Sequence, residues 1–206
     1  GLGGSSAINA MVVIRGDPND YEHWRRLGNP GWGWHDVLPC FIRSEDHVLG
    51  VSEWHGAGGP LAVTAPTSPN PIAEAFIDAA VACGHRRNPD FNGAHREGVG
   101  LYHLSVRDGV RCSAAAAYLR PAMARPNLEV ITKARALRVA LDGDRAVGVD
   151  VFDGLQVRRI DAMQEVLVCA GAIDSPKLLM LSGFSKGCAA LALRKPPPLV
   201  PSCLIA

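Results

Sequence analysis

The chain has 206 residues, of which 48% are hydrophobic, so it is long and apolar enough for one domain or two small ones and is not a largely disordered protein. Its 21 Lys and Arg residues nearly balance its 20 Asp and Glu residues. This balance gives no electrostatic reason to expect a nucleic-acid or membrane-surface partner. No apolar run is long enough for a membrane span and no signal peptide is evident, so we expect a cytoplasmic location.

The first nine residues, GLGGSSAIN, form a glycine- and serine-rich loop that leads into the apolar run Met11–Ile14. Glycine has no Cβ, so a ligand can lie directly against the main chain of such a loop. If a helix starts there, its N–H groups favour an anionic group such as a pyrophosphate. An ordinary Gly/Ser loop that caps a helix remains the alternative on composition alone.

Two helices are predicted next along the chain. Asp17 is a good N-cap, Pro18 suits the first turn and Gly28 suits the end of the first helix. The segment HDVLPCFIRSED, residues 35–46, has a helical pattern despite Pro39. The sequence therefore predicts a pair of short helices joined by the turn NPGWGW.

The most clearly marked helix lies in NPIAEAFIDAAVACG, where Asn70 caps the first turn, Pro71 takes the first position and Gly84 ends it. A glycine turn and a strand, GAGGPLAVT, precede this helix. Its apolar residues fall at helical spacing on one face. They are Ile72, Ala75, Phe76, Ala79, Ala80 and Cys83.

A strand is predicted over Val99–Val106, before the turn RDGV, and a helix is predicted to start at Ser113 and to end or kink at Pro121. From residue 127 the pattern changes to four short β runs: LEVIT, ALRVAL, AVGVDVF and QVRRI. The turn LDGD separates two of them. These runs predict a small sheet.

The segment QEVLVCAGAIDSPKLLMLSG predicts a buried strand, a small-residue turn and a helix with Ser175 as N-cap and Pro176 in the first position. In doubly wound sheets, ligands lie beyond the carboxyl ends of such strands. Gly171 and Ala172 lack bulk, so a planar cofactor could pass beside them. Close packing of helix on strand without a ligand is the alternative.

Six cysteines occur without any C-x-x-C motif or zinc-type Cys/His spacing, so no metal site is predicted. Several lie within apolar runs, as Cys83 and Cys169 do. This pattern favours buried free thiols in a reducing compartment.

Together, these stretches resemble the glucose–methanol–choline (GMC) family of flavin oxidoreductases, and most closely its choline-dehydrogenase-like alcohol dehydrogenases. GLGGSSAIN with IRGDPNDYEHW is similar to the first family signature, and GAIDSPKLLMLSG is similar to the second. Segments such as WHGAGGPLAV and RCSAAAAYLRPAMARPNLEVIT follow between them in family order. The resemblance covers about residues 1–185. It implies a mixed α/β (α+β) fold: a partial FAD-binding, Rossmann-like domain with an inserted substrate-cap region.

By position in the family, residues 1–14 and 127–183 would form a discontinuous, partial FAD-binding domain, and residues 15–126 the cap. Residues 184–206 depart from the family pattern, and we interpret them as a poorly ordered tail that arises from a shifted reading frame or a truncated gene model. The family's G-x-G-x-x-G loop is absent from this sequence. The family's catalytic histidine belongs to a segment that has no counterpart here. The resemblance thus predicts an incomplete and inactive fragment, with no catalytic residue assigned.

The resemblance also implies FAD as the cofactor. Ile8 occupies the position where some choline-oxidising relatives bond a histidine to the flavin, so the cofactor would be non-covalent. The first loop would approach the diphosphate and the flavin ring, Ala136 would hold the adenine through its main chain, and the turn after the last strand would pass near the cofactor. The implied cofactor-binding residues are Gly1, Gly3, Gly4, Ser5, Asn9, Ala10, Met11, Val12, Ala136, Gly171 and Ala172.

The implied activity is that of a flavoprotein oxidoreductase that transfers hydride from the CH–OH group of a small-molecule alcohol to FAD and passes the electrons to an unidentified acceptor. A hydroxynitrile-lyase-like relative that keeps FAD and a non-catalytic remnant remain alternatives. The seven histidines are expected to have structural roles. The pairs Asp17/Asp20 and Glu45/Asp46 are expected to cap helices or to be solvated.

Overall fold

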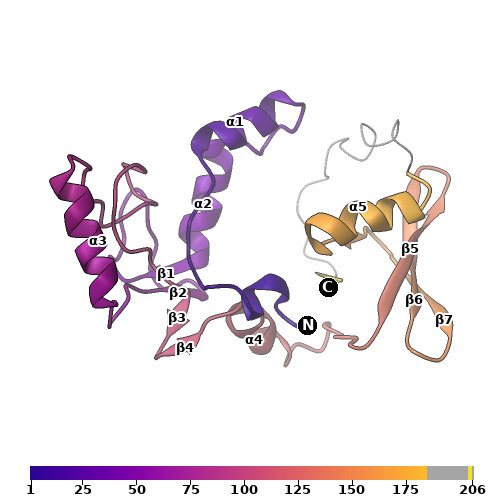
Figure 1. The fold of residues 1–206 in the computed structure, drawn as a ribbon. Coiled ribbons are helices and arrows are strands. Elements are labelled where there is room, and N and C mark those ends of the chain that lie inside the picture. Colours follow the sequence, from indigo (N-terminus) through magenta and orange to yellow (C-terminus); the bar gives the residue numbers. More distant parts are fainter. Residues whose placement is uncertain (185–203, 206) are drawn as a thin grey trace. The chain divides into compact units, whose positions relative to one another are not determined.

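The computed structural model describes residues 1–184 and 204–205 (Figure 1). The chain divides into two compact units, Gly1–Pro121 (unit 1) and Ala122–Ala206 (unit 2). Both units mix helices and strands. The predicted tail lies outside the described residues except for Phe184 and a two-residue strand, β9 (Leu204–Ile205).

Two short helices in unit 1, α1 (Pro18–Arg26) and α2 (Trp34–Ser44), pack against each other and confirm the first two helix predictions (Figure 1). The side chain of Asp17 caps α1 by accepting a backbone N–H of its first turn. Tyr21 of α1 is buried, and its ring centroid lies 5.9 Å from that of Phe41 in α2. Aromatic packing therefore holds the pair together.

Helix α3 (Pro71–Ala82) begins at its predicted N-cap, Asn70, whose side chain accepts the N–H of Ile72. Its packing differs from what the apolar spacing suggests. Ile72 and Phe76 are 78% and 67% exposed, whereas Ile77 is the buried residue of this helix. The main apolar face of α3 is thus open within the part of the chain that the structure describes.

Strands β1 (Glu45–His47) and β2 (Leu61–Val63) pair in parallel. Strands β3 (Val106–Arg107) and β4 (Val110–Arg111) form an antiparallel hairpin. Its two turn residues, Asp108 and Gly109, have φ values of 51° and 74°. Positive φ at both positions is the backbone geometry that a tight two-residue hairpin requires.

The prediction of a strand over Val99–Val106 is wrong for most of its length. Only Val106 belongs to a strand, and Val99 and Leu104 make isolated bridges instead. Leu104 bridges both Val12 and Thr64, so this segment connects distant parts of unit 1. Its partners are single residues of other segments, and this prevents a continuous ladder.

The helix predicted from Ser113 is present as a wide π-helical turn, η2 (Ala115–Leu119), which continues into α4 (Arg120–Ala122). Ala117 of this segment packs with Ala62 of β2 and with Cys112 in a small buried core. Small side chains at these points let the helical turn approach the strand closely.

In unit 2, β5 (Arg135–Asp142), β6 (Arg145–Phe152) and β7 (Val157–Asp161) form an antiparallel sheet in sequence order. They confirm three of the four predicted β runs. The first run, at residues 128–132, is not a strand. The buried side chains of the sheet include Val139, Val149 and Val151.

Strand β8 (Leu167–Val168) is followed by helix α5 (Gly171–Leu181), which packs on β5 (Figure 1). β8 also pairs in parallel with β9. The predicted helix start is wrong by five residues, because α5 begins at Gly171, with Ala170 as its N-cap, and includes Ser175 and Pro176. The Ser175 hydroxyl instead accepts the N–H of Ala170 from within the first turns of the helix.

A charged row crosses the sheet of unit 2. Asp150 of β6 lies opposite Arg138 of β5 and Arg159 of β7, and its two carboxylate oxygens lie 2.6 and 2.8 Å from their Nε atoms. Hydrogen bonds from Arg159 and Arg138 lower the pKa of Asp150 to about 2. This pKa lies below the ordinary value of 3.8. The ion pairs of Asp150 therefore stabilise unit 2 fully above about pH 4, and this stabilisation is lost as the pH falls toward 2.

Replacing Asp150 by asparagine is expected to lower the unfolding midpoint of unit 2, because the two guanidinium groups then face each other without an anion between them. All four tryptophans lie in unit 1, so hydrogen exchange of β5–β7 is the suitable measurement. Asp142→Asn, at the exposed end of β5, is the control and should leave exchange unchanged. Equal hydrogen-exchange rates in the two variants would show that the ion pairs of Asp150 do not stabilise the sheet of unit 2.

The cysteine prediction is only partly right. Cys40, Cys83, Cys112 and Cys169 are free thiols, but only Cys112 is buried. Cys83 is exposed because it ends helix α3, whose apolar face is open. Cys169 is exposed because it lies directly before the N-cap of α5, outside both β8 and the helix. Among the described residues, no helix combines the length and the apolar character that crossing a bilayer requires.

Candidate functional site

The first predicted cofactor stretch forms a loop around a short helical turn, η1 (Gly4–Ala7). Gly3 and Gly4 have φ values of 89° and 54°, a region that favours glycine. A Cβ on Gly3 would lie 3.2 Å from the Cβ of Ala115, whereas a Cβ on Gly1 or Gly4 would meet nothing within 4 Å. Gly3 therefore serves packing within unit 1, and Gly1 and Gly4 lie against open space.

After this loop the chain runs along the segment at residues 103–105. The N–H of Val13 donates to the His103 carbonyl at 2.9 Å, and the N–H of Ser105 donates to the Met11 carbonyl at 2.8 Å. Within the described residues, the N–H groups of Ala10 and Val12 have no hydrogen-bond partner. One edge of this segment is thus paired, and the other offers free main-chain donors.

The side chains here are placed by an unusual backbone conformation. Met11 has a φ of 63°, which is uncommon for a residue other than glycine. Its N–H donates to Oδ1 of Asn9 at 3.0 Å. Asn9 is exposed, as is Ser5, and Ile8 is 85% exposed. The predicted residues of the first stretch therefore lie together on one accessible loop.

The remaining predicted residues lie in unit 2. Gly171 has a φ of 88°, and a Cβ at this position would meet nothing within 4 Å. Ala172 is exposed beside it at the start of α5. Ala136 is half-buried in β5, opposite Val151 of β6. The structure describes each unit by itself, so the relation of these residues to the first loop stays a prediction.

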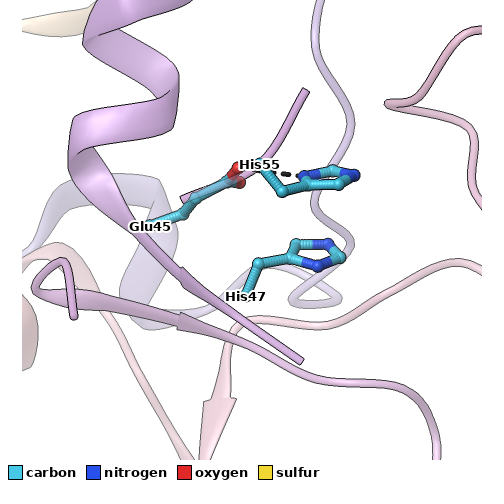
Figure 2. A group of neighbouring side chains, drawn as sticks. All are labelled: Glu45, His47 and His55. Atoms are coloured by element: carbon cyan, nitrogen blue, oxygen red, sulfur yellow. Dashed lines mark hydrogen bonds and ion pairs between the residues drawn. The ribbon is translucent and has the colours of Figure 1, made fainter. Parts of the chain in front are cut away.

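A buried polar cluster in unit 1 joins Arg15, Glu45, His55 and Asp90. Oε1 of Glu45 lies 2.6 Å from Nη2 of Arg15. The same oxygen lies 3.0 Å from Nδ1 of His55 (Figure 2). The other nitrogen of His55, Nε2, lies 2.8 Å from Oδ2 of Asp90. Both ring nitrogens of His55 thus lie within hydrogen-bond distance of carboxylate oxygens.

His47 lies on this cluster as a neutral ring. Its ring is stacked on that of His55, with centroids 3.7 Å apart and planes 13° apart (Figure 2). The ring centroid of His103 lies 4.8 Å from that of His47, and the two planes are 88° apart. Burial and the positive charge of His55 lower the pKa of His47 to about 4, and burial also lowers the pKa of His103. Nε2 of His47 is buried and has no hydrogen-bond partner among the residues that the structure describes.

Glu45, His47 and His55 have ligand atoms within 4.8 Å of one another, but their orientation does not suit a metal ion. The lone pairs of an imidazole lie in its ring plane, so two stacked, nearly parallel rings cannot direct them at one ion. In addition, Nδ1 of His47 accepts the N–H of Leu49, which leaves the proton on Nε2. The cluster therefore acts as a hydrogen-bonded structural network.

This network also holds the segment that follows the first loop. Oδ1 of Asn92 accepts the N–H of Arg15 at 2.8 Å, and Nδ2 of Asn92 donates to the Val13 carbonyl at 2.9 Å. Asn92 in turn donates its N–H to Asp90. The main chain at residues 13–15 is thereby fixed to the buried charges, next to the free donors of Ala10 and Val12.

Two features were missed by reasoning from the sequence. Glu45 is buried and ion-paired, which corrects the expectation that it is solvated or caps a helix. The alternation Glu45-x-His47 on a strand was the available signal, because alternate residues of a strand face the same side. The other is Arg111, which contacts the first loop across 102 positions of sequence and had no local signal.

Comparison with known proteins agrees with this geometry. The sequence profile of the GMC oxidoreductase family matches residues 1–193. "Oxygen-dependent choline dehydrogenase" of Brucella anthropi is 44% identical over 183 residues, which are 89% of this chain and 33% of that protein. The chain therefore spans about a third of the length of the curated relatives it matches.

Solved structures agree as well. Pyridoxine 4-oxidase from Mesorbium loti is 40% identical with a TM-score of 0.81, and the match covers 87% of this chain and 36% of that one. An FAD-dependent oxidoreductase from Chaetomium thermophilum is 30% identical with a TM-score of 0.80, over 87% of this chain and 34% of that one. The predicted mixed fold, a partial FAD-binding domain of Rossmann-like type, is confirmed. This chain belongs to the GMC oxidoreductase family.

Proposed function

We propose that the chain is part of an FAD-dependent oxidoreductase that acts on the CH–OH group of a small alcohol, with choline-like alcohols as the first candidates. The observation that carries this proposal is the 44% identity with a choline dehydrogenase across 89% of the chain. Residues 1–14 and 127–183 would belong to the FAD-binding part and residues 15–126 to the substrate cap.

The first loop has the chemistry that a flavin requires. The N–H groups of Ala10 and Val12 are free donors within the described residues, and a flavin ring carries oxygen and nitrogen acceptors along one edge. Gly1 and Gly4 leave room for close approach to the main chain. Asn9 would meet the ring beside these donors. Ile8 offers no nucleophile, so the cofactor would be held non-covalently.

Unit 2 would supply the other contacts. Gly171 and Ala172 offer an open, small-residue surface at the start of α5. Ala136 would contact the adenine through its main chain. When bound, FAD supplies the hydride acceptor, and the residues of this chain bind and orient it. The buried rings of His47, His55 and His103 belong to the structural network, so we assign them no proton transfer.

The relatives named above are a dehydrogenase and oxidoreductases, which favours redox chemistry over the lyase alternative. The non-catalytic remnant is distinguished from the proposed function by cofactor binding. We expect the 206-residue chain to quench the fluorescence of added FAD in a saturable manner, and denaturation to release all of the flavin. The urea-unfolded chain is the control. No quenching at up to about 1 mM FAD would support the remnant and contradict a cofactor site in this chain.

The substrate class requires a second experiment. The 183 residues that align with the Brucella anthropi choline dehydrogenase at 44% identity can replace the corresponding segment of that protein. We expect a yellow chimera whose flavin is bleached by choline in the absence of oxygen. A yellow chimera that responds only to other alcohols would overturn the choline-like substrate and retain the redox proposal. A folded, colourless chimera would overturn both.

A further inference from the structure

Arg111, at the end of β4, binds the first loop at Ser6 and Asn9. Its Nη1 donates to the Ser6 carbonyl at 3.2 Å, to the Asn9 carbonyl at 2.7 Å and to the side-chain Oδ1 of Asn9 at 3.0 Å. A guanidinium group that donates to several acceptors makes stronger hydrogen bonds than a neutral donor does. These contacts fix two main-chain carbonyl groups and one side chain at the same point.

A second contact at this point determines which way the Asn9 amide faces. Its Oδ1 accepts from Arg111 and also from the N–H of Met11 at 3.0 Å. Both partners are donors only, so the atom between them must be the amide oxygen. The NH2 group of Asn9 is then presented outward, and within the described residues it has no partner.

Free main-chain donors occur in the same segment as the NH2 group. Ala10 follows Asn9 directly and Val12 is three residues after it, and the N–H groups of both are unpaired within residues 1–184 and 204–205. The loop therefore displays unpaired donors, beside main-chain carbonyls of Ala10 and Val12 that also have no partner among the described residues. A ligand that pairs with the NH2 group and with these N–H groups must bring acceptors.

We infer that Arg111 is a positioning residue of this loop, which fixes the Asn9 amide so that its NH2 group donates to an acceptor on the bound cofactor. This inference rests on the proposed FAD site. It adds the sense of the hydrogen bond and the residue that sets it. Arg111 itself is turned toward the loop backbone, so its effect on the cofactor would pass through Asn9.

Three variants separate the two parts of this inference. Arg111→Met removes the donors, and Arg111→Lys keeps a positively charged donor. Asn9→Asp keeps an acceptor for Arg111 and for the Met11 N–H but removes the NH2 donor. Arg107→Met is the matched control, because Arg107 lies on the other strand of the same hairpin and donates to the Pro60 carbonyl instead.

The first measurement is hydrogen exchange of residues 5–13 in the protein without FAD, after tryptophan fluorescence has shown that each variant is folded. Arg111→Met is expected to exchange about tenfold faster or more, because hydrogen bonds to a charged donor are lost. Arg111→Lys should recover part of the protection, and Asn9→Asp and Arg107→Met should match the wild type. Unchanged exchange in Arg111→Met would overturn the positioning role.

The second measurement is the FAD titration. Asn9→Asp should weaken FAD binding about tenfold or more although its loop exchanges as in the wild type, because a carboxylate would face an acceptor. Wild-type affinity in Asn9→Asp would overturn the inferred donor. If the wild-type chain binds no FAD, the proposed function fails, whereas the exchange data still decide whether Arg111 positions the loop.

Discussion

Replacing Glu45 by glutamine is expected to lower the free energy of unfolding of unit 1 by about 3–5 kcal/mol, the usual cost of breaking a buried ion pair from one side. Oε1 of Glu45 accepts from Arg15, from His55 and from the N–H of Gly56. The side chains of Arg15 and Glu45 are each 4% exposed. Without the carboxylate charge, the Arg15 guanidinium would remain buried with no anion beside it.

Urea unfolding followed by tryptophan fluorescence measures this effect in the correct part of the chain, because all four tryptophans lie in unit 1. Glu74→Gln is the matched control. Oε2 of Glu74 lies 3.7 Å from Nη1 of Arg87 in an exposed ion pair. Such pairs contribute at most about 1 kcal/mol to the free energy of unfolding. Equal unfolding midpoints for Glu45→Gln and Glu74→Gln would show that the buried network does not stabilise unit 1.

Acidification from pH 6.5 to pH 4 is expected to destabilise unit 1 through His47. The pKa of His47 is lowered from 6.5 to about 4 by burial and by the charge of His55. Between these two pH values the unfolded chain binds a proton that the folded chain does not bind, so the free energy of unfolding falls as the pH falls. The full shift corresponds to about 3 kcal/mol.

The matched pair for this measurement is His47→Phe and His85→Phe. Phenylalanine keeps an aromatic ring beside His55 but cannot titrate. In His47→Phe, the slope of the unfolding free energy against pH should therefore be smaller than in the wild type by up to about 1.4 kcal/mol per pH unit. His85 is exposed, so its variant should keep the wild-type slope. Part of the slope should persist in His47→Phe, because burial lowers the pKa of His103 in the same direction. Identical slopes in both variants would refute the assignment.

Sequence reasoning succeeded where the determinants were local. The start of α1 at Asp17 and of α3 at Asn70 followed from side chains that accept hydrogen bonds within the next two residues. It failed for α5, where Ser175 and Pro176 carry the local signal of a helix start but the helix begins earlier, at Gly171. Ser175 is not the N-cap, because its hydroxyl accepts the N–H of Ala170 from inside the helix.

The site was predictable only in part, because only some of its determinants are local in the sequence. The glycines and Asn9 are contiguous, so the loop could be recognised, and the family resemblance is confirmed. The partners of that loop are far away in the sequence and have no common spacing. Arg15, Glu45 and His55 resemble ordinary surface residues until the fold buries them together. Polar residues that face inward on a short strand do not show in hydrophobic periodicity.

The reach of Arg111 across 102 positions has a consequence for biosynthesis. At a translation rate of 5–20 residues per second, the loop at residues 6–9 waits about 5–20 s for the strand that will hold it. Ala114, which donates its N–H to Ser6, emerges later still. The nascent segment at residues 6–9 therefore leaves the ribosome before the residues that will hold it have been synthesised, and its hydrogen-bonding groups are hydrated in that interval.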